Sequence, residues 1–202
     1  MRLANIILAG SLAAAPVYAA ELAVPSGTYE LKPTHSSLHW QVKHFGISNY
    51  TGSFTGLSAT LELDAADPEN SQLTATVNTA SVDTGFPWPE AHDWNAEMAG
   101  PEWFNADAFP KAEFTATSLS MTGDNSGEMT GDLTFLGVTK PISMEVSLIG
   151  ALGERKHADG AVMGFEAMAK FNRSDFGFGM LIPVASDEVT LFINAEFHQI
   201  VE

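Results

Sequence analysis

The chain of 202 residues contains no cysteine. Disulfide bonds and thiolate-based metal sites are therefore excluded, and the fold must be stabilised by packing alone. About 180 residues follow the N-terminal segment, which is a normal length for one domain and enough to bury a core without cross-links. We therefore expect one packed domain over residues 20–202.

Basic side chains are scarce. Only 9 lysines and arginines accompany 25 aspartates and glutamates, and the formal net charge is −16. Such a surface repels nucleic acids and anionic lipid headgroups at long range, so nucleic acid is excluded as a partner. A glycine-rich loop that would hold phosphate is also missing. The acidity is compatible with simple solubility or with a basic partner, and it does not distinguish between them.

Motifs for catalysis and for metal binding are missing as well. No Gly-x-Ser-x-Gly elbow occurs, and no spacing of Ser, His and Asp indicates an activated nucleophile. His35 and His39 have the spacing of a helical pair, but they follow Pro33 in a segment with a strand pattern. On a strand, His39 and His44 point to opposite faces. We predict that the protein is not an enzyme, has no metal site and requires no cofactor.

Long apolar runs are absent except at the N-terminus. There, Arg2 precedes an apolar run from Ile6 to about Ala15, and small residues follow. This pattern predicts a secretory signal peptide over residues 1–19, with cleavage after Ala19 or Ala20. The run is shorter than the roughly 20 residues that a membrane span needs. We expect an exported protein.

The rest of the chain has an apolar residue at every second position in many segments. This period predicts strands, among them residues 57–63, 73–79, 128–135, 141–148 and 189–197. We expect eight or nine strands, mostly antiparallel because short links join them. An all-β sandwich and a closed barrel both remain open, although the long strands favour the barrel. Small residues occur at inward positions and either leave room for a ligand or fit the taper of a filled barrel: Ala59, Ala75, Gly131, Ala167, Ala169 and Ala195.

One segment departs from this pattern. Residues 86–100 predict a short helix with Trp94 and Met98 on one face, ending at Gly100 before Pro101. The next residues, GPEWFNADAFPKAEF, are too aromatic for an ordinary solvated loop and contain two prolines, so they cannot form one long helix.

The chain resembles the YceI-like (polyisoprenoid-binding) family. The resemblance is carried by YELKPTHSSLHWQVKHFG, TGSFTG, ASVDTG, PEWFNADAFPKAEF, GDLTFLGVTKP, KFNRSDFGFG and SDEVTLFINAEF, in the family's order. It implies an extended, lipocalin-like, eight-stranded antiparallel barrel whose long apolar cavity holds an isoprenoid quinone, another polyisoprenoid or a fatty-acid-like chain. It also implies a periplasmic location and the possibility of a homodimer.

The chain departs from the family pattern beside the aromatic segment. Many members have Arg-Asp and then Leu-Arg where this chain has Trp94-Asn95 and Met98-Ala99. We expect this difference to alter head-group recognition or the dimer contact. The helix and the aromatic segment are predicted to close one end of the barrel, either facing a ligand or forming a plug, through Trp94, Met98, Trp103 and Phe104.

Further candidate ligand contacts come from the alternation of the strands. Trp40, Val42 and His44 share one strand face, and we expect an imidazole there to bond to a core group or, as an alternative, to a ligand oxygen. Arg173 and Asp175 could pair with each other or clamp a head group, although we favour a structural tie between a strand end and a turn. The remaining candidates are aromatic, and each is as compatible with core packing as with ligand contact: Phe54, Phe135, Phe171 and Phe176.

The resemblance and the pattern together predict an exported binding protein that transports, stores or sequesters a long amphiphile. The alternative is an accessory protein of a membrane quinone–cytochrome system that acts through its acidic surface. The expected partners are thus an amphiphilic lipid, a second copy of the chain or a membrane-associated redox protein.

Overall fold

The computed structural model of the protein describes residues 22–153 and 160–201. The predicted signal peptide, residues 1–19, lies outside these ranges. Within them, no helix is long and apolar enough to cross a membrane.

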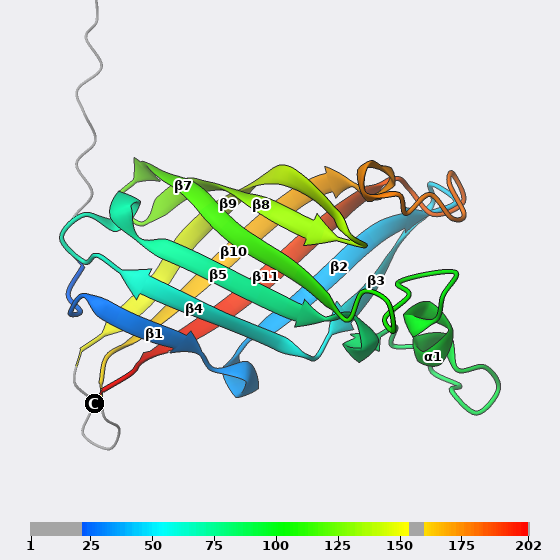
Figure 1. Ribbon diagram of the computed structural model, residues 1–202, viewed down its shortest axis with the longest axis horizontal. Coiled ribbons are helices and arrows are strands. Elements are labelled where there is room, and N and C mark those ends of the chain that lie inside the picture. The colour runs from blue at the N-terminus through cyan, green and yellow to red at the C-terminus, as the bar shows by residue number, and fades with distance from the viewer. Residues whose placement is uncertain (1–21, 154–159, 202) are drawn as a thin grey trace, which may run out of the picture.

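Eight strands form a closed antiparallel ring (Figure 1). In ring order they are β1 (Gly27–Leu31), β4 (Leu57–Leu63), β5 (Gln72–Asn78), β7 (Lys111–Gly123), β8 (Ser126–Phe135), β9 (Val138–Leu152), β10 (Val162–Asn172) and β11 (Glu188–Gln199). Pairing of β1 with β11 completes the ring. The barrel is therefore confirmed and the sandwich is wrong.

Strand β11 changes partners along its length. Its first part, Thr190–Asn194, pairs with β2 (Ser37–His44), and its last part, Phe197–Gln199, pairs with β1. From β2 the sheet continues through β3 (Ser48–Phe54) to β6 (Val82–Asp83). Strands β2, β3 and β6 thus form a three-stranded flap that continues the sheet beyond the ring.

The helical part is small. Helix α1 (Trp94–Ala99) lies beyond the end of the barrel next to β6 and β3 (Figure 1). The single-turn 3-10 helices are η1 (Pro33–His35), η2 (Pro68–Asn70), η3 (Thr79–Ser81) and η4 (Arg173–Phe176). The prediction of a helix near residues 86–100 was too long, because Pro87 and Pro89 interrupt its first half. The helix begins only after Asp93, whose side chain accepts the Ala96 N–H at 2.9 Å.

Close packing of rings on glycines shapes the inner wall. Gly131 on β8 lies directly under the Phe114 ring of β7, and a Cβ added at Gly131 would be 2.3 Å from that ring and 2.5 Å from the Thr115 carbonyl. The inward glycine therefore does not leave empty space, because Phe114 fills it.

Arg173 fixes the turn between β10 and β11. The strand stops at Asn172, and the Arg173 side chain, only 4% exposed, folds inward. Its guanidinium donates to the carbonyls of Ser186, Phe178 and Ala185 at 2.9–3.1 Å. The pairing of Arg173 with Asp175 considered from the sequence is wrong, because the strand does not continue and Asp175 is exposed. The favoured structural tie agrees with these contacts.

Asp187 completes this turn from the other side. Its carboxylate accepts the Ser174 N–H at 2.9 Å and the Ser174 hydroxyl at 2.7 Å. These hydrogen bonds, together with the nearby Arg173 charge, hold the pKa of Asp187 below its usual value, while partial burial opposes them. Burial lowers the pKa of Arg173, and Asp187 opposes that shift.

The Gly131→Ala substitution tests the packing under Phe114. We expect it to destabilise the protein by about 1–3 kcal/mol, since the backbone carbonyl of Thr115 cannot move away cheaply. Chemical denaturation at equilibrium measures the effect. Gly150→Ala on β9 is the matched control, because nothing lies within 4 Å of the added Cβ. Equal unfolding free energies for both variants would contradict the close approach.

The Asp187→Asn substitution tests the turn through its pH dependence. Because the folded-state pKa of Asp187 is depressed, its stabilisation is present above the unfolded value of about 3.9 and is lost as the pH falls through the folded value. The difference in melting temperature between wild type and D187N should thus be largest near neutral pH and shrink below about pH 4. D132N, at an exposed aspartate of β8, should follow the wild-type curve. A constant difference for D187N would refute this assignment.

Candidate functional site

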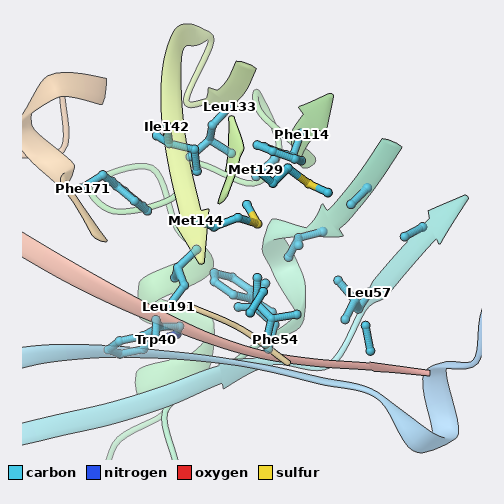
Figure 2. Close-up of a pocket in the computed structure, with 18 of the residues that line it drawn as sticks. Trp40, Phe54, Leu57, Phe114, Met129, Leu133, Ile142, Met144, Phe171 and Leu191 are labelled. Carbon is cyan, nitrogen blue, oxygen red and sulfur yellow. The ribbon is translucent and has the colours of Figure 1, made fainter. Parts of the chain in front are cut away.

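An apolar cavity of about 590 Å³ lies inside the barrel. This volume is within the range of small-molecule pockets, roughly 300–1,000 Å³. Side chains from opposite walls surround the same space in Figure 2, because alternate residues of each strand point inward. The labelled members of this wall are Trp40, Phe54, Leu57, Phe114, Met129, Leu133, Ile142, Met144, Phe171 and Leu191.

Small inward residues contribute to the open space. Four of the six alanines and glycines singled out in the sequence line the cavity: Ala59, Ala75, Ala167 and Ala195. Ala169 is instead buried in the surrounding core, and Gly131 is covered by Phe114. The choice between a filled barrel and a hollow one is decided for the hollow one, because a cavity of about 590 Å³ remains between the walls.

The aromatic segment after α1 covers one end of the cavity. Trp94, Met98, Trp103 and Phe104 all line it, as the sequence predicts for the closed end. Phe104 is buried, and its ring contacts the rings of both Phe54 and Phe178 in a tilted arrangement, at 5.4 Å between centroids. Trp94 and Trp103 meet edge to face at 6.2 Å. The segment therefore both closes the barrel and forms part of the cavity wall.

Asn95 of α1 holds this cap in place. Its side-chain oxygen accepts the backbone N–H of Thr84 at 2.8 Å and the Thr84 hydroxyl at 2.7 Å. Thr84 follows β6 directly, so Asn95 ties α1 to the flap. The Tyr50 hydroxyl from β3 donates to the Thr84 carbonyl at 2.7 Å and strengthens the same connection.

Trp40 is the most unusual polar group of the cavity. Its indole lies flat on Gly52, where an added Cβ would be 2.2 Å from the ring. The indole nitrogen, Nε1, is buried, and in the described part of the chain it has no hydrogen-bond partner. A buried N–H without an acceptor costs free energy. This atom is therefore a place on the apolar wall where a hydrogen-bond acceptor would be stabilised.

His44 lies at the rim rather than in the core. The residue is exposed at the end of β2, and its ring contacts the neighbouring Phe45 edge to face at 4.6 Å. It borders the cavity, as does Val42, which is half-buried on the same face. The expectation that His44 bonds to a core group is wrong, because His44 is the last residue of β2 and is exposed there.

The remaining predicted contacts divide into two groups. Phe54, Phe135, Phe171 and Arg173 border the cavity. Phe176 does not: it is 1% exposed and packs behind the wall, 5.3 Å from Phe171 and 5.9 Å from Phe135 between ring centroids. Its place in η4 turns it away from the interior, which the strand pattern could not indicate.

Several wall residues were not among the sequence candidates. Tyr50, Leu191, Ile142 and Met144 border the cavity and come from three strands, β3, β11 and β9. The signal for them was present, since each shares the inward face of its strand with residues already identified. Ile142, Met144 and Leu191 lie in strands that the alternation identified, so naming every inward residue would have found them, and Tyr50 shares its strand face with Phe54.

Comparison with known proteins agrees with this architecture. The family described as "YceI-like domain" matches residues 29–197. Protein YceI of Shigella flexneri is 35% identical over 162 residues, covering 80% of this chain and 81% of that protein.

Two solved structures share the fold. The Campylobacter jejuni YCEI protein is 31% identical and superposes with a TM-score of 0.68 over 79% of this chain and 90% of that one. A polyisoprenoid binding domain from Saccharophagus degradans reaches a TM-score of 0.61 at 16% identity, over 85% of this chain and 98% of that domain. With a family match over most of its length and relatives above 30% identity, the chain belongs to the YceI-like family.

Proposed function

We propose that the protein binds a long amphiphile, with the apolar tail inside the barrel. The observation that carries the proposal is the closed barrel with a cavity of about 590 Å³ and an almost wholly apolar wall. Removing apolar surface from water stabilises a complex by about 25 cal/mol per Å². A tail that spans the cavity would therefore bind without a charged anchor.

The polar end of the ligand is best accommodated beside Trp40. The buried Nε1–H of Trp40 needs an acceptor, and a quinone, phenol or carboxyl oxygen supplies one. The wall farther from α1 combines aliphatic and small side chains such as Leu61, Ala75 and Leu148 with the Phe165–Phe197 ring pair, and it is apolar throughout, which suits a tail. We infer an isoprenoid quinone, another polyisoprenoid or a fatty-acid-like molecule, oriented with its head towards the α1 end.

The Saccharophagus degradans domain is described as polyisoprenoid-binding, and it shares the fold of this chain. At 16% identity this likeness concerns the fold only, so the proposal depends on the cavity of this chain.

A transport, storage or sequestration role follows from this ligand class. An isoprenoid or fatty tail is poorly soluble in water, and a closed barrel would keep it from water and from premature transfer to a membrane. The predicted signal peptide would deliver such a carrier to the periplasm. A homodimer and a membrane-associated redox partner for the acidic surface remain predictions.

Native mass spectrometry of the mature protein, purified without detergent, tests the binding function. We expect one amphiphile per chain, recovered by organic extraction and identified as an isoprenoid or a fatty species. A ligand-free mass that also stays unchanged after incubation with isoprenoid quinones and fatty acids would refute the proposal. The aromatic cap would then be a plug.

The Trp40→Phe substitution tests the orientation. It should weaken binding of a short-tailed isoprenoid quinone about 2- to 10-fold, the value of one neutral hydrogen bond. Binding of the hydrocarbon squalene should fall less, because squalene has no acceptor, and the squalene result corrects for lost ring area. Displacement of an environment-sensitive dye measures both affinities. Trp88→Phe is the control, since Trp88 is 60% exposed and does not line the cavity. Equal losses for quinone and squalene would contradict a hydrogen bond to Trp40.

A further inference from the structure

Two histidines and a glutamate meet on the outside of the barrel, away from the cavity. One carboxylate oxygen of Glu196, Oε1, is 2.9 Å from Nδ1 of His35 and 2.6 Å from Nε2 of His198. The three potential ligand atoms all lie within 4.8 Å of one another. Segments about 160 residues apart in the sequence thus place three donor side chains at one point.

The backbone holds these side chains together. Glu196 and His198 are two apart on β11, so both point outward while Phe197 between them is buried inside the barrel. His35 belongs to η1, the turn between β1 and β2. That turn is fastened to β11 because the Lys32 N–H donates to the Glu196 carbonyl at 2.7 Å and the Glu196 N–H donates to the Ser36 hydroxyl at 3.0 Å.

The side chains are also accessible. The side chains of His35, Glu196 and His198 are 57%, 30% and 27% exposed, so an ion can reach them from solvent. Glu30 lies opposite His198 in the β1–β11 register, and residues opposite each other share a face. A second carboxylate therefore borders the cluster, and the net charge of −16 favours cations at long range.

We propose that His35, Glu196 and His198 form a binding site for a divalent transition metal, with zinc as the best fit. Two imidazole nitrogens and one carboxylate oxygen are a known three-ligand set for zinc, with a fourth position left for water. Metal–ligand lengths of about 2.0–2.1 Å in a tetrahedron require ligand atoms about 3.3 Å apart. The hydrogen-bonded pairs His35–Glu196 and His198–Glu196 are 2.9 and 2.6 Å apart. A small outward movement of the two imidazole rings would bring both pairs to that separation.

The site would join two elements that are far apart in the sequence, the turn η1 and the strand β11. Glu196 lies at the position where β11 has left β2 and begins to pair with β1, and His35 lies in the turn that connects those two partners. A bound ion would therefore cross-link the point where the sheet branches. This inference does not involve the cavity, so it stands or falls independently of the amphiphile.

Calorimetric titration of the untagged, chelator-treated mature protein with zinc chloride tests the proposal. We expect one zinc per chain and a rise in melting temperature with zinc concentration, because a ligand that binds only the folded state stabilises it. Glu196→Gln and His198→Gln should each weaken zinc binding by at least about 10- to 100-fold, since the loss of even an outer-shell partner has effects of that size. Magnesium, which prefers oxygen ligands, should not produce the thermal shift.

His39→Gln is the matched control, because His39 is an exposed histidine on the outer face of β2 and is not part of the cluster. It should bind zinc as the wild type does. Circular dichroism without zinc establishes that each variant is folded. Absence of stoichiometric zinc binding, or zinc binding that survives in both E196Q and H198Q, would overturn the proposal and leave the three side chains as a hydrogen-bonded cluster.

Discussion

Closure of the sheet between β1 and β11 is the constraint on which the remaining structure depends. An open antiparallel sheet would leave a row of unpaired backbone groups and would expose its apolar face. The ring avoids both, although only Tyr29, Glu30 and Leu31 provide its last pairings. Tyr29 is fully buried, and its hydroxyl donates to the Pro25 carbonyl at 2.6 Å. The short closing strand is thus anchored by its side chain as well as by its backbone.

A closed ring of eight strands also determines what kind of interior is possible. A barrel of this size either fills with side chains or holds one ligand. Here large residues gather at the α1 end, with Trp40, Phe104 and Phe178 in one cluster, while alanines alternate with leucines farther along. The cap and the cavity are therefore parts of one packing arrangement, in which rings that close the end also form its wall.

The sequence was sufficient wherever the structure follows a local period. Strand 57–63 was predicted with the bounds that β4 has, and the inward faces of β2 and β11 follow from alternation. Features that depend on distant segments were not predictable. Phe176 turns away because a 3-10 helix replaces the strand, and His35 meets Glu196 only because the ring closes. The spacing of residues in a single sequence does not indicate which distant segments will contact each other.

The partner change of β11 has a geometric consequence. Because Thr190–Asn194 pair with β2 while Phe197–Gln199 pair with β1, β11 has a different neighbour at each end of the barrel. The end next to α1 bears the rings of Trp40, Phe104 and Phe178, whereas the other end combines leucines and alanines with the Phe165–Phe197 pair. An elongated molecule inside would meet two unlike ends, so its two directions of insertion would differ in energy. An elongated guest would thus have a preferred direction in the barrel before any hydrogen bond forms.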